Sequence, residues 1–296
     1  MGAMNRPLHT RLRDTVEALA ALGERSTRKP DALRQAMQWI EREFSVLGYR
    51  VRREFYVADD VECVNLDATI DSFSAAAPHV LCGAHYDSAW GTPGADDNLS
   101  AVAILLELAA RFRGHPRAGQ LRLAAFVNEE PPHFLQGTMG SLVFARNCRA
   151  QREAITAMVC LESLGVFSDA PGSQLIPREF AELIPDPAAR GDFVAIVGND
   201  DSLHLVGAFV EAFRSDGRIP PLGASLPALA VSDHWSFWEC GYPAVMLTDT
   251  AMLRNPHYHA PTDTPEHLNY AAMCAVADAT EAGLARLLSE LPAGPE

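Results

Sequence analysis

Histidine, aspartate and glutamate side chains gather at the points where several apolar stretches of the sequence end. The stretch PHVLCGAHYDS, residues 78–88, begins apolar and turns polar at His85, and the loop after it holds further aspartates in GADDN. The next two apolar stretches end in Glu129 and Glu130 and in Glu162. Imidazole nitrogens and carboxylate oxygens together suit Zn²⁺, with Mn²⁺ or Co²⁺ as substitutes. The pattern therefore favours a metal-dependent reaction.

Two later clusters add to this set of candidate ligands. They are SDHWSF, with Asp233 and His234, and NPHYHAPTDT, with His257 and His259. A pair of metal ions that activates one water needs a bridging carboxylate, terminal ligands on each ion and a general base. The clusters contain enough residues for all of these positions. The residues alone do not decide between the two late histidines, or between the two adjacent glutamates.

The elements that must position these residues alternate between strands and helices. Helical periodicity occurs near residues 8–24 and 31–48, and the strand-like runs 49–57 and 62–70 suggest a hairpin at a sheet edge. Apolar strands then alternate with amphipathic helices, which predicts a largely parallel sheet covered on both faces. In such sheets, ligands bind beyond the carboxyl ends of the strands. We predict an α/β fold, a three-layer α/β/α sandwich around a mostly parallel mixed sheet, in a single domain over residues 1–296.

Composition disfavours several classes of protein. The net charge of −14 argues against nucleic acid and anionic membrane surfaces as partners. No apolar run approaches the length of a membrane span, and residues 1–26 contain no continuous apolar segment of the kind found in secretory signals. The six cysteines are scattered without CxxC spacing, which fits free thiols in a reducing compartment. These features predict a cytoplasmic protein and leave its oligomeric state open.

The motifs, in combination and in their order, resemble those of the co-catalytic zinc aminopeptidases. They are HYDS, GADDNLSAVA, NEE followed by MGS, LES, SDHWSF and YHAPTDT. That family includes bacterial leucyl aminopeptidases, glutamate carboxypeptidase and, as a divergent branch, glutaminyl cyclase. The resemblance spans residues 78–265, and the N-terminal helices and edge hairpin of residues 1–70 add little to it. It implies a zinc-exopeptidase-like fold and hydrolysis of the N-terminal peptide bond of a peptide.

The resemblance also implies a role for each matching residue. Glu129 is the general base, which takes a proton from a water shared by two zinc ions and later delivers it to the leaving amine. Asp87 orients the imidazole of His85. Glu162 stands where the commonest family pattern has aspartate, so its extra methylene allows a different mode of coordination. The implied metal ligands are His85 and Glu162 for one ion, Glu130 and His259 for the other, and Asp97 between both.

Other residues near the motifs receive secondary assignments. We expect Asp96 to shape its loop or to support a ligand. Asp233 and His234 match a family motif and are expected to line the substrate pocket, although a hydrogen-bonded structural role fits His234 equally well. Arg254 is the main candidate for binding a substrate carboxylate. Otherwise GADDN, NEEPPHF and SDHWSF contain no Arg or Lys, which favours a peptide substrate with a free α-ammonium group.

Other functions remain compatible with the sequence. A glutaminyl-cyclase-like acyltransferase typically uses one zinc and carries Trp before the last histidine ligand, where this chain has Tyr258, and it usually lacks the asparagine found here as Asn98. An amidohydrolase acting on a small non-peptide amide would need the same metal core. A catalytically inactive binding protein has no need of Glu129 beside a complete ligand set. A serine nucleophile is unsupported because the chain lacks a GxSxG elbow.

Overall fold

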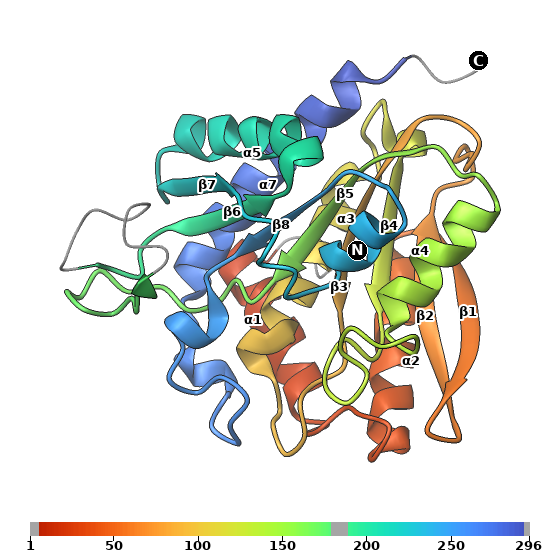
Figure 1. The fold of residues 1–296 in the computed structure, drawn as a ribbon. Helices are drawn as coiled ribbons and strands as arrows, with labels where there is room; N and C mark the ends of the chain where they lie inside the picture. The colour runs from red at the N-terminus through yellow and green to blue at the C-terminus, as the bar shows by residue number, and fades with distance from the viewer. Residues whose placement is uncertain (1–5, 179–188, 293–296) are drawn as a thin grey trace.

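The computed structural model describes residues 6–178 and 189–292 and is built around one eight-stranded sheet (Figure 1). The strands lie in the order β1-β2-β4-β3-β5-β8-β6-β7. Their bounds are β1 Arg50–Ala58, β2 Val61–Thr69, β3 His79–His85, β4 Leu121–Phe126, β5 Ile155–Glu162, β6 Val194–Gly198, β7 Pro221–Ser225 and β8 Ala244–Thr248.

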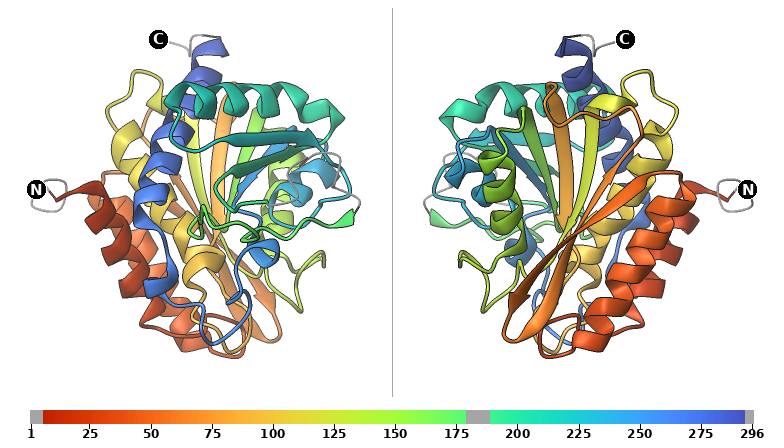
Figure 2. Two further views of the ribbon diagram at one scale, coloured as in Figure 1. Left: turned by 90° about the vertical axis from the view of Figure 1, so that its left-hand side faces the viewer. Right: turned by 90° about the vertical axis from the view of Figure 1, so that its right-hand side faces the viewer.

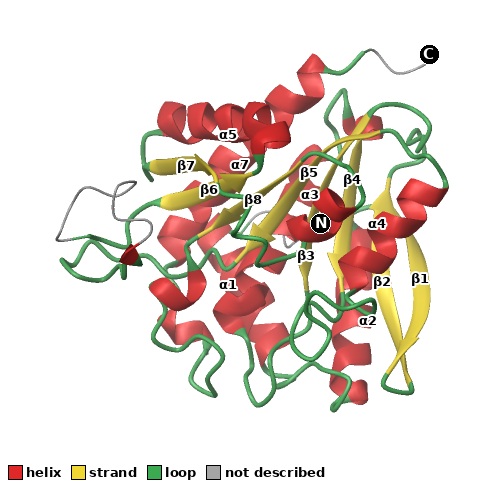
Figure 3. Ribbon diagram, in the orientation of Figure 1, coloured by secondary structure: helices red, strands yellow, loops and turns green. Residues whose placement is uncertain are grey.

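The directions of the central strands bring their carboxyl ends to one edge. β3 pairs in parallel with β4 and with β5, and β5 pairs in parallel with β8. β1 and β2 form the predicted antiparallel hairpin, with β1 at the edge of the sheet. β2 also runs antiparallel to β4, and β6 runs antiparallel to β8, so the sheet is mixed. The loops that follow β3 and β4 therefore start beside one another, and Figure 3 shows loops gathered at this end of the sheet.

Helices cover both faces of the sheet. The apolar residues of α1, α2, α3, α5 and α7 pack on one face, and those of α4 and α6 pack on the other. Figure 2 shows α4 separated from α1 and α2 by the strands. This arrangement confirms the predicted three-layer α/β/α fold. The bounds are α1 Leu8–Ala20, α2 Pro30–Val46, α3 Ala101–Phe112, α4 Gly140–Ala150, α5 Leu203–Asp216, α6 His234–Glu239 and α7 Tyr270–Glu290.

Each face of the sheet has its own apolar core. The larger cluster includes Leu105 of α3 and Phe209 of α5, both fully buried. In the smaller cluster, Phe126, Phe144 and Phe237 contact one another with ring centroids 5.4–6.5 Å apart. Strands covered on both faces need apolar side chains throughout, which is why β3 and β5 read as nearly continuous apolar runs. The first strongly polar residue after such a run marks the place where the strand leaves the core.

Two elements were missed by the sequence analysis. β7, with the sequence PLGAS, begins with proline and contains glycine, so it lacks the usual strand signals and depends on its pairing with β6. α6 spans six residues, HWSFWE, which is too short to show helical periodicity. None of the described helices combines the length and apolar character needed to span a membrane.

Candidate metal centre

The predicted ligands reach one site because neighbouring strands end beside one another. His85 is the last residue of β3, Glu162 is the last residue of β5, and Glu129 and Glu130 follow β4. Asn128 has a φ of 60°, a left-handed conformation that asparagine adopts more readily than most residues. This turn breaks the alternation of a strand, so the carboxylates of both following glutamates face the histidines of the site.

Asp97 lies at the centre of the site, between the two histidines. Its Oδ1 is 3.3 Å from Nε2 of His85, and its Oδ2 is 3.1 Å from Nε2 of His259. Oε2 of Glu162 is 3.3 Å from the same His85 nitrogen, and Oε2 of Glu130 is 3.0 Å from the same His259 nitrogen. The atoms therefore form two groups, each with an imidazole nitrogen, a terminal carboxylate oxygen and one oxygen of Asp97.

These spacings suit atoms that share a zinc ion. Bonds of about 2.0–2.2 Å at a tetrahedral angle place two ligand atoms about 3.4 Å apart. Nε2 of His85 and Oδ1 of Asp97, which face each other, are buried and have no hydrogen-bond partner among the described residues. Because buried polar atoms are nearly always paired, these orphaned atoms call for a partner that the protein itself does not supply. Zinc bound between these side chains fits the residues that are present.

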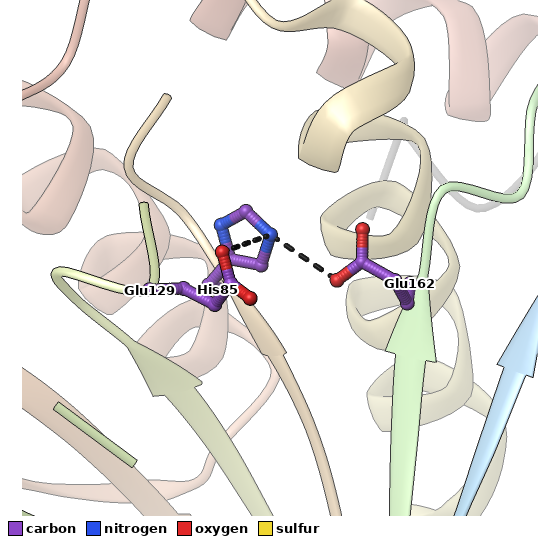
Figure 4. Close-up of side chains that lie close together, drawn as sticks. All are labelled: His85, Glu129 and Glu162. Atoms are coloured by element: carbon purple, nitrogen blue, oxygen red, sulfur yellow. Dashed lines mark ion pairs between the residues drawn. The ribbon is translucent and has the colours of Figure 1, made fainter. Parts of the chain in front are cut away.

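Glu129 stands slightly apart from the group around His85. Its Oε2 is 3.8 Å from Nε2 of His85, compared with 3.3 Å for Glu162 (Figure 4). Glu129 is thus the carboxylate that lies farther from His85, as expected of a general base that acts through a water. Ligand atoms of His85, Glu129 and Glu162 nevertheless lie within 4.8 Å of one another, so the assignment of Glu129 as base rather than ligand stays a prediction.

Asp87 supports several parts of the site at once. Its Oδ1 lies 3.4 Å from Nδ1 of His85, the ring nitrogen that faces away from Asp97. The same carboxylate accepts hydrogen bonds from the backbone N–H groups of Glu129 and Glu130, both at 3.1 Å. Asp87 is 2% exposed and is enclosed by these contacts. It therefore holds the imidazole and the glutamate turn in one geometry without being available to a substrate.

The carboxylates favour positive charge at both histidines. Burial disfavours the charged imidazole of His85, but Glu129 and Glu162 raise its pKa well above the usual value. Burial also opposes charge on His259, yet its hydrogen bonds with Asp97 and Glu130 raise its pKa to about 10. The site thus carries an excess of negative charge that cations can balance.

Burial raises the pKa of Glu129 and Glu130, whereas burial on its own lowers the pKa of a histidine. It raises the pKa of Glu130 to about 8, and the negative charge of Asp97 acts in the same direction. It also raises the pKa of Glu129 well above its usual value; His85 opposes this shift, and the neighbouring carboxylates add to it. A carboxylate in these surroundings holds a proton more tightly than one in water, which suits proton transfer near neutral pH.

Glu162 has a partner that the sequence analysis missed. Ser163 donates a hydrogen bond to its Oε1 at 2.9 Å, and Ser232 donates to its Oε2 at 2.6 Å. Ser232 belongs to the SDHWSF motif, which the sequence analysis examined for its aspartate and histidine. The longer side chain of glutamate thus still directs one oxygen toward His85, and a serine from another loop holds that oxygen in place.

Asp233 and His234, from the same motif, are both fully buried. Asp233 lies close enough to the metal centre for its negative charge to raise the pKa of Glu129, so its place beside the substrate stays a prediction. Nε2 of His234 donates to the backbone oxygen of Leu229, and its ring meets Trp238 edge-on. Burial lowers the pKa of His234 to about 4, which keeps it neutral. His234 therefore has the structural role that was the alternative for it.

Arg254, the one candidate receptor for a substrate carboxylate near the motifs, lies mostly in the interior. Its side chain is 7% exposed, its Nε donates to Oε1 of Gln174, and its Nη1 donates to the backbone oxygen of Phe193. The guanidinium lies 4.7 Å from the centre of the Phe193 ring. These contacts disfavour Arg254 as a receptor for a substrate carboxylate, because they hold Nε and Nη1 in the interior and only Nη2 has no partner among the described residues.

The structure distinguishes His259 from His257 as the candidate ligand and shows what Asp96 binds. Nδ1 of His257 lies 2.9 Å from Oγ1 of Thr262, so this histidine is bonded within its own loop, whereas His259 faces Asp97. Oδ1 of Asp96 accepts the backbone N–H of Gly165 at 2.9 Å, which is the loop-shaping role predicted for it.

Tyr258 is a further residue of the site, noted in the sequence only as a difference from cyclases. Its ring stacks on that of His259 with centroids 3.9 Å apart and an angle of 14° between the planes. Burial raises the pKa of its phenol, and the nearby carboxylates of Asp97 and Glu130 add to this shift. The hydroxyl therefore stays protonated at neutral pH and can donate a hydrogen bond.

The fold and the strand-end ligands together define a class of protein. A three-layer α/β/α sandwich that gathers imidazoles and carboxylates at the carboxyl edge of its sheet is the architecture of a zinc-dependent exopeptidase. The chain belongs to Peptidase family M28, whose model matches residues 65–283. It is accordingly a metallohydrolase of the peptidase type.

Curated relatives support this family assignment. The chain is 37% identical over 268 residues to the uncharacterized protein YfbL of Escherichia coli strain K12, covering 86% of this chain and 80% of the relative. It is 26% identical over 251 residues to a probable leucine aminopeptidase of Arthroderma otae, covering 81% of this chain and 60% of the relative. The chain thus spans about three-fifths of the length of that fungal relative.

Solved structures share the fold at low sequence identity. The LapA aminopeptidase of Legionella pneumophila superposes with a TM-score of 0.74 at 18% identity, covering 96% of this chain and 73% of that one. The glutaminyl cyclase of Fimbriiglobus ruber superposes with a TM-score of 0.67 at 19% identity, covering 94% and 95%. Both likenesses concern the fold, and they do not distinguish hydrolysis from cyclisation.

Proposed function

We propose that this protein is an aminopeptidase that binds two zinc ions and removes the N-terminal residue of a peptide. The observation that carries the proposal is the position of Asp97, whose two carboxylate oxygens face two different histidines at 3.3 and 3.1 Å. A carboxylate placed in this way can bridge two ions, with His85 and Glu162 completing one group and His259 and Glu130 the other.

Each protein residue of the site has a separate role in the proposed reaction. Zinc, when bound, polarises the scissile carbonyl and lowers the pKa of the attacking water. Glu129 accepts the proton of that water as the new C–O bond forms, and it donates the proton to the leaving nitrogen as the C–N bond breaks. Asp87 holds the turn that carries Glu129 in register with His85. Tyr258 supplies a hydroxyl that can hydrogen-bond to the carbonyl oxygen as negative charge develops on it.

The charge of the site favours recognition of a free amino terminus. Buried carboxylates surround the predicted zinc ions. We infer that their negative charge exceeds the positive charge of the ions, and this excess attracts the ammonium group of a free amino terminus. Arg254, the candidate receptor for a C-terminal carboxylate, is buried against Gln174 and Phe193. This arrangement supports removal of an N-terminal residue over removal of a C-terminal one.

A substrate pair tests the proposal. The zinc-loaded protein is incubated with a peptide that has a free amino terminus and with its N-acetylated form, and products are separated by mass. We expect cleavage of the first bond of the free peptide and no cleavage of the acetylated one. Efficient cleavage of the acetylated peptide would contradict the aminopeptidase function, and so would ammonia release from an N-terminal glutamine peptide whose chain stays intact.

A further inference from the structure

Arg25 lies far from the metal motifs in sequence but is buried beside them in the structure. It belongs to the segment between α1 and α2, outside the residues matched by the family model. Its side chain is nevertheless fully buried. A buried guanidinium must place its N–H groups on acceptors, because an unpaired buried charge is costly. The identity of those acceptors shows what this arginine does.

The acceptors of the Arg25 side chain are the backbone oxygen of Gly23 in its own segment and backbone carbonyls at both ends of the loop that joins His85 to Asp97. Nε donates to the oxygen of Tyr86 at 2.9 Å, Nη1 donates to that of Pro93 at 2.5 Å, and Nη2 lies 3.5 Å from that of Gly94. One side chain thus connects the residue after the first predicted ligand with a residue three positions before the bridging one.

The main chain of Arg25 adds a second connection to the middle of the same loop. The N–H of Ser88 donates to the backbone oxygen of Arg25 at 3.0 Å, and the N–H of Arg25 donates to Oγ of Ser88 at 3.0 Å. Oγ of Ser88 in turn donates to the backbone oxygen of Thr92. The loop therefore wraps around Arg25, which serves as its internal support.

The loop needs such a support because much of it is buried outside the sheet. Residues 86–89 are buried but belong to no helix or strand, so neighbouring strands do not provide ladder partners for their carbonyls. Gly94 shows how closely the parts fit, since a Cβ there would lie 2.3 Å from the backbone oxygen of Asp97 and 3.0 Å from Nη2 of Arg25. Gly94 is therefore packed between the guanidinium of Arg25 and the main chain of Asp97, where a larger residue would not fit.

The opposite side of the Asp97 turn is held by a carboxylate. Asp263 accepts the backbone N–H of Asp96 at 3.0 Å and that of Asp97 at 3.2 Å. Asp263 is 1% exposed. The positively charged Arg25 thus binds the backbone carbonyls before this turn, and the carboxylate of Asp263 binds the backbone N–H groups of the turn itself.

We infer that Arg25 is a positioning residue of the metal centre: by binding both ends of loop 86–94 it sets the separation between His85 and Asp97. The inference rests on the proposed two-ion centre and adds the N-terminal segment to it. It goes beyond a general packing role, because it predicts a specific effect on zinc binding. Lysine cannot replace the arginine, since a single ammonium group cannot span carbonyls at both ends of the loop.

Zinc affinity measures this role directly. Full-length wild-type protein and Arg25→Lys are stripped of metal, and zinc binding is titrated in competition with a chromophoric chelator. Substitutions that disturb the support of metal ligands typically cost about 10–100-fold in affinity, which is the loss expected here. Arg122→Lys is the matched control. Arg122 is equally buried, but it binds Asp67 and Glu153 near the start of β4, away from the ligands at the other end of the strand.

The outcomes separate the inference from the proposed function. If wild-type protein does not bind two zinc ions, the two-ion centre is wrong. If it does, and Arg25→Lys binds zinc as tightly as wild type or no more weakly than Arg122→Lys, the positioning role is wrong. Should Arg25→Lys fail to fold, Ser88→Ala tests the same support by removing one bond to Arg25 and one to Thr92. A several-fold loss of zinc affinity at an unchanged melting temperature supports the role, and unchanged affinity overturns it.

Discussion

Replacing Glu129 by glutamine removes its charge and its capacity to accept a proton while keeping the size of the side chain. In the structure this carboxylate is 3.8 Å from Nε2 of His85, whereas that of the predicted ligand Glu162 is 3.3 Å away. We therefore expect Glu129→Gln to retain zinc and to lose hydrolysis. Glu130→Gln is the matched control, because Glu130 is equally buried but lies 3.0 Å from Nε2 of His259.

The expected magnitude is the usual cost of removing a group that transfers a proton in the reaction. Loss of a general base lowers kcat by about 10²–10⁴-fold, which corresponds to about 3–5 kcal/mol of transition-state stabilisation. The fold should not be weakened, because burial already disfavours the charged form of Glu129 and a neutral amide is less costly to bury. The melting temperature of metal-free Glu129→Gln should therefore equal or exceed that of wild type.

Two measurements on each variant test the reasoning. Zinc content is determined by atomic absorption after dialysis, and kcat and KM are determined with an aminoacyl anilide at saturating zinc. We expect zinc content at the wild-type level and a collapse of kcat for Glu129→Gln, and loss of zinc for Glu130→Gln. Equal zinc loss in the two variants would show that Glu129 is a ligand. Near-normal turnover by Glu129→Gln would show that another group moves the proton.

Three further results are expected. Asp97→Ala should lose both ions and Glu162→Ala only one, as measured by zinc stoichiometry; loss of a single ion from Asp97→Ala would rule out its bridging role. Zinc binding at pH 7 should release protons, detected by calorimetry in buffers of different ionisation enthalpy, because the pKa of His259 is raised to about 10 and that of Glu130 to about 8. For the same reason the free energy of unfolding of the metal-free protein should fall as pH rises from about 6.5 to 8, since the folded state holds protons that the unfolded chain has released; rising stability over this range would contradict these shifts.

The layered fold, and the edge of the sheet at which the candidate ligands lie, could be predicted from the pattern of apolar residues. Alternating apolar strands and amphipathic helices specify the covered sheet, because a strand buried on both faces needs an unbroken apolar run. His85 and Glu162 follow such runs, so their places at strand ends could be read directly. The order of the motifs then led to the family, which the match over residues 65–283 confirms.

Local sequence could not supply the details that depend on approach between distant segments. The residues next to Asp97 in the sequence do not indicate that its two carboxylate oxygens will face His85, 12 positions before it, and His259, 162 positions after it. β7 and α6 carry too little periodicity to be recognised, and His234 looks like a pocket residue until the packing of α6 places its ring against Trp238 and the backbone of Leu229.

Arg25 is the clearest example of a residue whose role could not be predicted before the folded chain was known. In the sequence it is one of many arginines and belongs to no motif. Its importance arises when the segment after α1 packs against loop 86–94 and its guanidinium becomes the partner of the carbonyls there. Any type of residue can accept a hydrogen bond through its backbone carbonyl. Such a contact therefore leaves no pattern in the loop sequence, and it becomes visible only when the chain is folded.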